Sequence, residues 1–432
     1  MAKLKETFPV QEATLDNGLK VRLIPDRNAP IASLYTFFRV GSRNERPGVT
    51  GISHLFEHMM FNGAKKYGPK QFDRVLESQG GTSNAYTSPD LTVYHEEFAS
   101  EALETVLDLE SDRMRSLSID DQSLASEREV VKEERRVVVD NDITGIMDEE
   151  LGSLVFKAHP YRWPVIGWMG DVNQISRADC ESYFRTYYAP NNATLYLAGD
   201  FDPAQALASI RRLYDDIPQG PPAPAVINSE PEQKGERRAE IRYPAQAPSL
   251  MVGYRAPAAQ DPDTFALDVL QFALSVGEGC RLNRELVYGK GIAVSAHMDW
   301  SWRVDPGLAV FYLELQPGAD PRRAEQALYD QLDRLIREGL SAPELDKARN
   351  NLRAQNLREL STNGGRAHAL GLYEILLGSW RDGLTLEQRY RDVTPRRLKE
   401  VAARIFAPER RSVVTLVPES EILSPRRSRR AA

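Results

Sequence analysis

Apolar and polar positions in the first quarter of the chain predict a short amphipathic helix and, further on, a β-hairpin. The segment GISHLFEHMMFNG has helical spacing of its apolar residues, with Thr50 before it as N-cap and Gly63 suited to the left-handed conformation that ends a helix. Two glycines, Gly80 and Gly81, end the following helix. Strands are then expected over 82–88 and 91–98, around a turn at Ser-Pro-Asp.

A second helix is predicted over residues 121–136, DQSLASEREVVKEERR. Glu127 and Glu134 lie two helical turns apart there, with Val130 and Val131 between them on one stripe. A core-facing stripe that begins and ends in glutamate is costly unless each carboxylate has a partner. A solvated, charge-rich helix with every glutamate exposed is the alternative.

The patterned segments fall into two similar halves. Residues 218–236, PQGPPAPAVINSEPEQKGE, concentrate proline and polar residues and predict a linker between a domain over 1–217 and a second over 237–432. Each half runs through strands, a helix, a hairpin and long helices, which indicates an internal duplication.

The composition mainly excludes some classes of protein and of binding site. The 432 residues are 41% hydrophobic, which suffices for real cores, and the formal net charge of −7 argues against a nucleic-acid partner. No apolar run approaches the roughly 20 residues that cross a bilayer. The start, MAKLKETFPVQEA, has no apolar region of the kind that signal peptides carry. Cys180 and Cys280 are too few for a disulfide framework or a zinc-thiolate site.

The first predicted helix carries candidate metal chemistry in the pattern H-x-x-E-H, formed by His54, Glu57 and His58. Positions i and i+4 share a helix face, so both imidazoles can hold one ion while Glu57 stands beside them. Zinc-dependent hydrolysis needs three protein ligands and one open position for water, with a carboxylate nearby to take its proton. We expect the third ligand from a carboxylate of the 121–136 helix. Histidines that are merely solvated or hydrogen-bonded are the alternative.

Beyond this motif, a long run of sequence resembles the pitrilysin or insulinase family of zinc peptidases, the inverzincins. The likeness is carried by GISHLFEHMMFNGAKKYGPKQFDRVLESQGGTSNAYTSPDLTVYHEEF and, after a gap, by SEREVVKEERR. The segments ATLDNGLKVRLIPD, HPYRWPVIGWMGDV and FRTYYAPNNATLYLAGDFDP fit the same pattern, so the resemblance covers nearly the whole chain. It is nearest to the short bacterial members and to the catalytic subunit of mitochondrial processing peptidase.

The resemblance implies a metal centre with one zinc ion per chain. Its ligands fall on His54, His58 and Glu134, and its general base on Glu57. Glu127 matches a second catalytic-site carboxylate that orients the site without binding zinc.

The predicted hairpin is the expected platform for a peptide substrate. An exposed edge strand can pair with an extended peptide, main chain to main chain. The resemblance implies that Asn84 and Ala85 lie on this edge and that Phe61 borders the pocket just beyond the scissile bond. An ordinary paired hairpin, with Tyr86 and Tyr94 in the core, fits the same pattern.

The architecture that the resemblance implies is α+β, with two homologous domains. Each would be a largely antiparallel sheet with helices on one face, and together they would enclose a central chamber; periodicity alone supports only mixed α and β content. In the second half Asp268, Gln271 and Phe272 fall where the first half has its two histidines and base. We therefore expect metal chemistry in the first domain only.

One stretch departs from the family pattern. Many members carry a sequence like LREKxGLAY in the second half, whose Arg and Tyr position the substrate carbonyl. This chain has LVYGKGIAV there, with Val287 and Val294 at the Arg and Tyr positions. Valine cannot donate a hydrogen bond to an oxyanion, and the loss of one such donor costs about 100- to 1000-fold in rate. We expect a heterodimer in which a related non-catalytic subunit supplies both residues; a local substitute such as Tyr288 is the alternative.

Together these features predict a zinc metalloendopeptidase that hydrolyses peptides or unfolded segments in the bacterial cytoplasm or periplasm. A non-catalytic structural or assembly subunit on the same scaffold is the main alternative, and it predicts broken ligand sets. A metal-dependent hydrolase of non-peptide substrates is another, which the peptide-pairing hairpin disfavours. The intact set His54, Glu57, His58 and Glu134 favours the peptidase.

Overall fold

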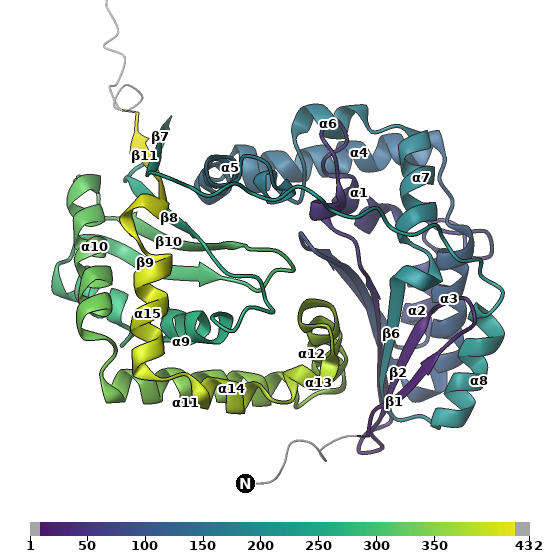
Figure 1. Ribbon diagram of the computed structural model, residues 1–432. Coiled ribbons are helices and arrows are strands. Elements are labelled where there is room, and N and C mark those ends of the chain that lie inside the picture. Colours follow the sequence, from purple (N-terminus) through teal and green to yellow (C-terminus); the bar gives the residue numbers. More distant parts are fainter. Residues whose placement is uncertain (1–8, 420–432) are drawn as a thin grey trace, which may run out of the picture. The chain divides into compact units, whose positions relative to one another are not determined.

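The computed structural model describes residues 9–419, which form two compact units, each built on one β-sheet (Figure 1). Residues 1–8, to which part of the signal-peptide expectation refers, lie outside the described range. Within that range, none of the helices has the length and apolar character needed to span a bilayer. Both sheets are mainly antiparallel and are accompanied by many helices, which confirms the predicted α+β class.

The two units are not the contiguous halves predicted from the sequence. Unit 1 combines the described residues up to Asp140 with Ala158–Ser229 and Ala354–Leu386, and unit 2 comprises the remainder. The crossing at Ser229 lies inside the expected linker, but a segment from each half also joins the other unit. The cause is packing: a helix of the second half lies on the first sheet, and α5 (Ile143–Val155) lies on the second.

Unit 1 is organised around a six-stranded sheet with the order β1-β2-β6-β3-β5-β4. Its strands are β1 (Gln11–Thr14), β2 (Lys20–Pro25), β3 (Ile31–Phe38), β4 (Thr82–Thr87), β5 (Thr92–Ala99) and β6 (Ala193–Gly199). Neighbours are antiparallel except for β2 and β6. The predicted hairpin is therefore present as β4 and β5, and β4 is an edge strand of the sheet.

Helices cover the sheet of unit 1 and supply its core. They are α1 (Ile52–Met59), α2 (Gln71–Ser78), α3 (Leu103–Ser116), α4 (Asp121–Arg135), α6 (Met169–Gln174), α7 (Arg177–Tyr187), α8 (Pro203–Tyr214), α12 (Asn363–Leu377) and α13 (Trp380–Gly383), with a π-helical turn after α4, η4 (Arg136–Asp140). Buried side chains of α1, α3, α7 and α8 meet alternate residues of the strands in one apolar cluster. This cluster fixes α1 against the sheet.

Unit 2 has a five-stranded sheet with the order β7-β11-β8-β10-β9, which matches β2-β6-β3-β5-β4 of unit 1 and has no counterpart of β1. Its elements are β7 (Arg237–Tyr243), β8 (Ser249–Arg255), β9 (Ala293–Trp300), β10 (Leu308–Leu315), β11 (Arg411–Pro418), α9 (Thr264–Ser275), the π-helical η7 (Asn283–Gly289), α10 (Pro321–Glu338), α14 (Leu386–Asp392) and α15 (Pro395–Ile405), while α11 (Ala342–Glu359) begins in unit 2 and ends in unit 1. The pair β7 and β11 is parallel, as β2 and β6 are in unit 1. The matching strand order is the outcome expected of an internal duplication.

Helix α12 packs on β3 and β6 although it comes from the second half of the sequence. A side chain at Gly371 would place its Cβ 2.2 Å from the Phe37 ring, so the helix can approach the sheet only with glycine at this position. The buried Arg22 side chain, from β2, donates two hydrogen bonds to Glu374, of 3.0 and 2.8 Å. Such bidentate, charge-assisted pairs fix geometry strongly, which holds α12 in one position on the sheet.

Replacement of Gly371 by alanine tests this close packing. In a solvated helix alanine is about 1 kcal/mol more favourable than glycine. At Gly371 the added methyl group overlaps Phe37, and overpacking of this kind costs about 1 to 3 kcal/mol. We expect Gly371→Ala to lower the free energy of unfolding of the chain, measured by urea denaturation. Gly170→Ala is the matched control, because no atom lies within 4 Å of a Cβ at that helical glycine; equal effects of the two substitutions would contradict the packing argument.

Candidate metal centre

The motif helix α1 begins differently from the prediction. Its N-cap is Gly51, in the left-handed region at φ 89°, and Thr50 does not cap the helix. The cap is supplied by Glu45, whose carboxylate accepts hydrogen bonds from the backbone N–H groups of Gly51 (2.9 Å) and Ser53 (2.8 Å). These are two of the N–H groups that a helix start leaves without partners. Burial raises the pKa of Glu45 to about 7, against the opposing effect of these hydrogen bonds.

A segment far along the chain lies directly against the start of α1. A Cβ on Gly51 would come within 2.5 Å of the Ile166 carbonyl oxygen, and one on Gly167 within 2.4 Å of the Gly51 nitrogen. Arg135, at the end of α4, donates a hydrogen bond of 2.7 Å to the Gly167 carbonyl. The same segment therefore contacts both α1 and α4, next to the residue Glu134.

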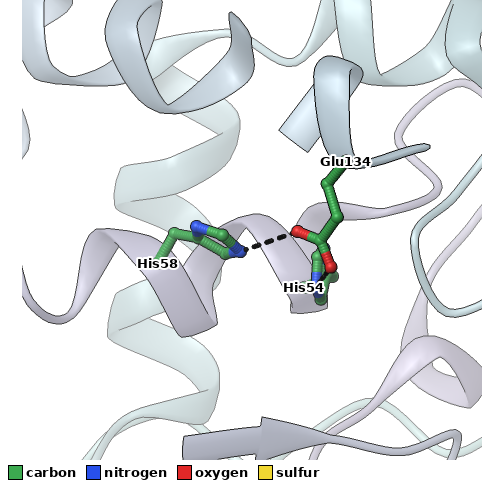
Figure 2. A group of neighbouring side chains, drawn as sticks. All are labelled: His54, His58 and Glu134. Atoms are coloured by element: carbon green, nitrogen blue, oxygen red, sulfur yellow. Dashed lines mark ion pairs between the residues drawn. The ribbon is translucent and has the colours of Figure 1, made fainter. Parts of the chain in front are cut away.

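His54, His58 and Glu134 come together between these two helices, as Figure 2 shows. His54 Nε2 lies 3.5 Å from one carboxylate oxygen of Glu134, and His58 Nε2 lies 3.3 Å from the other. Ligands at about 2.1 Å from a tetrahedral zinc ion are about 3.4 Å apart. These two distances involve different oxygens; with one ligand atom taken from each residue, all three lie within 4.8 Å of one another, which is close enough to hold one metal ion. In the described part of the chain, no other group of His, Cys, Asp and Glu side chains comes close enough to hold a metal.

The surroundings shift the pKa values of the two histidines in opposite directions. Burial lowers the pKa of His54 and outweighs the attraction of Glu134. Burial also acts to lower the pKa of His58, but the Glu127 and Glu134 carboxylates, 3.6 and 3.3 Å from its ring nitrogens, outweigh it and raise this pKa to about 9. The proximity of His58 in turn lowers the pKa of both glutamates. Two carboxylates thus gather around a single imidazolium, an arrangement that favours a cation.

The second ring nitrogen of His54 has no protein partner. His54 Nδ1 is buried and has no hydrogen-bond partner among the described residues. An unpaired buried nitrogen costs free energy, which is a common sign of a bound water. Because Nε2, and not Nδ1, faces Glu134, only the donor set supports a bound zinc ion.

Glu127 lies beside the candidate ligands and is not part of the group that could hold a metal. Its Oε2 is 3.6 Å from His58 Nδ1, the ring nitrogen that does not face Glu134. A carboxylate at the second nitrogen of a metal-bound histidine fixes the orientation of the ring. The predicted core-facing stripe was half right: Val131 is buried, but Val130 is 46% exposed.

Asn62, three residues beyond the end of α1, also contributes to this site. Its side chain is one of the groups that lower the pKa of Glu127. Neither Asn62 nor Glu45 was identified from the sequence as part of the site, since nothing in their spacing relates them to the metal ligands. A histidine motif reveals its ligands, whereas the residues that hold the helix can come from any loop.

Glu57 is half-buried on α1, between the two histidines in sequence. Its negative charge acts to raise the pKa of both imidazoles, although burial lowers that of His54 overall. Among residues 9–419, no side chain forms a hydrogen bond or ion pair with its carboxylate.

The edge strand β4 carries the residues expected to meet a peptide. Asn84 is exposed, and its side-chain oxygen accepts a hydrogen bond of 2.8 Å from the Ala85 N–H. Phe61 is half-buried and packs edge-on against Phe72. Tyr94 is fully buried, as the ordinary-hairpin interpretation expects. The edge position of β4 leaves one side of its backbone available for pairing.

In unit 2 the counterpart of the motif helix has no metal ligands. Asp268 on α9 is buried and accepts hydrogen bonds from Trp300 Nε1 (2.7 Å), Trp302 Nε1 (3.0 Å) and Tyr390 Oη (2.8 Å). Burial raises its pKa to about 6, although the three donors oppose this. The carboxylate is therefore satisfied by hydrogen bonds from side chains of its own unit.

The stretch that departs from the family pattern lies on the surface of unit 2. Val294 is 47% exposed at the start of the edge strand β9, and Tyr288 in η7 is 67% exposed. Val287 is partly buried. The valines offer no hydrogen-bond donor, so Tyr288 is the remaining side-chain hydroxyl of this stretch.

Comparison with known proteins gives consistent matches along the chain. A family profile described as insulinase (peptidase family M16) matches residues 20–167, and one described as the M16 inactive domain matches residues 174–352. A zinc protease of Helicobacter pylori, PqqE, is 29% identical over 414 residues, covering 94% of this chain and 93% of the relative. A probable mitochondrial-processing peptidase β subunit of Arabidopsis thaliana is 24% identical and covers 84% of this chain and 70% of that protein.

Solved structures show the same fold. The crystal structure of a protease from Helicobacter pylori superposes with a TM-score of 0.91 at 28% identity, covering 95% of this chain and all of that one. A structure described as an M16 inactive domain from Pseudomonas fluorescens has a TM-score of 0.85 at 20% identity and covers 95% of this chain. At 20% identity, this second structure shows a shared fold and nothing about function.

Zinc binding to this centre is expected to release a proton. His58 is protonated in the metal-free site near neutral pH, because its pKa is raised to about 9, and a ligand must be deprotonated. We predict one zinc ion per chain and release of about one proton per zinc at about pH 7, falling as the pH rises through the raised pKa. Calorimetric titration in buffers of different ionisation enthalpy measures this.

One substitution tests the ligand assignment, and a second on the same helix is its control. Glu134→Gln should weaken zinc binding strongly, since it removes an anionic ligand. Glu133→Gln on the same helix, an exposed residue that pairs with Arg136, should leave it unchanged. Zinc retained in Glu134→Gln at the affinity of the unsubstituted chain would refute the ligand assignment.

Proposed function

Because the chain belongs to the insulinase family of peptidases, M16, we propose that it is a zinc metalloendopeptidase that hydrolyses peptides or unfolded segments. The convergence of His54, His58 and Glu134 is the observation that carries this proposal. A non-catalytic subunit would have no need of an intact ligand set beside an unpaired glutamate.

The residues of the site divide the chemistry between them. Zinc, when bound, lowers the pKa of water in its open position and polarises the substrate carbonyl. His54, His58 and Glu134 would hold the ion, and Glu127 keeps the His58 ring in one orientation through its Nδ1. Glu57 takes the proton of the attacking water and delivers it to the leaving amine nitrogen as the C–N bond breaks.

The substrate is proposed to bind along the edge strand β4. An extended peptide would pair with the outer edge of this strand, so that recognition rests mainly on the main chain. Asn84 and Ala85 lie on β4, and Phe61 follows the motif helix closely. The open edge of β4 supports this mode, which suits unfolded segments better than folded proteins.

We further propose that the active enzyme is a heterodimer. Val287 and Val294 replace the Arg and Tyr that position the substrate carbonyl in many relatives, and neither can stabilise an oxyanion. A related subunit without the zinc ligands would supply both side chains. The exposed hydroxyl of Tyr288 is the alternative source of a donor within this chain.

Glu57→Gln tests the assigned base. The amide is nearly isosteric but cannot accept the proton, so peptide hydrolysis should fall by about 100- to 10,000-fold. The zinc content should remain at one ion per chain, because Glu57 is not a ligand. Turnover is measured with a fluorogenic peptide and zinc by atomic absorption; activity like that of the unsubstituted chain would contradict the role.

The proposed need for a partner subunit can be tested with substitutions in the isolated chain. The double substitution Val287→Arg, Val294→Tyr restores both donors and should raise kcat of the isolated chain by at least about 10-fold, since each such donor is worth about 100-fold or more. Val287→Leu with Val294→Phe is the control for volume alone. Full activity of the unsubstituted chain, equal to that with a related subunit, would refute the heterodimer.

A further inference from the structure

Helix α12 contacts the edge strand through one histidine that the proposed mechanism does not use. His368 Nε2 lies 2.7 Å from the hydroxyl oxygen of Tyr86, on β4. The two residues are 282 positions apart in sequence, so only the packing of α12 on this sheet brings them together. Both side chains are partly buried.

The imidazole of His368 is held firmly. It lies on α12 between Gly364 and Gly371, the two glycines that allow this helix to approach the sheet. Its ring packs against those of Tyr35 (5.8 Å between centroids) and Phe37 (6.3 Å). Burial lowers the pKa of His368 to about 4, so the ring is neutral near neutral pH and can hydrogen-bond Tyr86 without a counter-ion.

The strand β4 is held on one edge and by two helices. Along its length it pairs with β5, it contacts α1 and α2, and among the described residues no strand pairs with its opposite edge. On the face towards the main core, Ala85 packs against apolar residues, and Ser83 Oγ lies 3.2 Å from Asp73 Oδ1. On the other face, the hydrogen bond between Tyr86 and His368 ties the strand to α12. Edge strands twist and bend readily when little holds them, and a bent edge pairs poorly with a peptide.

We infer that His368 is a positioning residue for substrate binding, which acts through Tyr86 to hold β4 in the extended conformation that a peptide backbone can pair with. The inference rests on the proposed function. It makes α12 a support for the substrate strand, and it separates substrate affinity from the chemical step, because His368 is in contact with neither the metal ligands nor Glu57 within the described residues.

Three variants test the inference. His368→Phe keeps the ring volume and removes the hydrogen bond, Tyr86→Phe removes it from the other side, and the two are combined. We expect each single change to raise KM by about 3- to 10-fold with kcat and zinc content unchanged, as the loss of one buried hydrogen bond implies. The double variant should be no worse than either single one, because both remove the same interaction. His368→Gln, whose amide can still reach the hydroxyl, should recover most of the loss.

The matched control lies on the same helix. Tyr373→Phe also removes a buried hydrogen bond of α12, the one of 3.1 Å to Asn356 Oδ1, which lies on α11 and not on β4. It should leave KM unchanged. Equal KM increases in Tyr373→Phe and His368→Phe, or additive effects of His368→Phe and Tyr86→Phe, would overturn the inference in favour of general loosening.

A second readout does not depend on activity. Backbone amides of residues 82–87 should exchange with deuterium faster in His368→Phe than in the unsubstituted chain and in Tyr373→Phe, since local opening of β4 becomes easier. If no peptide is cleaved by the chain with or without a partner subunit, the proposed function fails, whereas this comparison still decides the role of His368. Unchanged exchange in β4 would overturn it.

Discussion

The close contact between the start of α1 and the segment around Gly167 is the constraint on which the metal centre depends. Two histidines on one helix cannot complete a zinc site, so a second helix must bring Glu134 to within hydrogen-bonding distance of both. Ligand geometry of this kind tolerates errors of only about half an ångström. Gly51 and Gly167 let the two backbones touch, and Arg135 ties the end of α4 to the same segment. The buried Glu45 then completes the first turn of α1.

The electrostatics of the centre follow from that placement. Glu57, Glu127 and Glu134 gather around two imidazoles in a partly buried site, an arrangement that carries more negative than positive charge. The proton on His58 compensates part of this charge, which is why its pKa rises. In unit 2 the helix that corresponds to α1 carries a buried carboxylate in a different environment. There Asp268 has three neutral donors and needs no cation, so the duplicated scaffold carries a satisfied core residue at the corresponding position.

Local structure near the motif was predictable because it depends on short-range pattern. The hairpin of β4 and β5 appears within one residue of its expected ends, and the helix over 121–136 is present as α4. The predictions were wrong where contacts with residues distant in sequence determine the local structure. Thr50 has the composition of an N-cap, but its hydroxyl bonds to Asp171 and leaves the cap to Glu45. Val130 shares a helical stripe with Glu127, but no element covers it, so it remains exposed.

The sequence by itself determined the candidate chemistry: the spacing of His54, Glu57 and His58 places two candidate ligands and a candidate base on one helix, and the resemblance implies Glu134 and Glu127. The first three assignments depend on residue type and helical period, which are local. Tertiary structure alone decided which helix lies on which sheet. Helix α12 belongs to unit 1, packs on Phe37 and brings His368 to Tyr86. These contacts join surfaces that are far apart in the chain, and no periodicity within one segment encodes them.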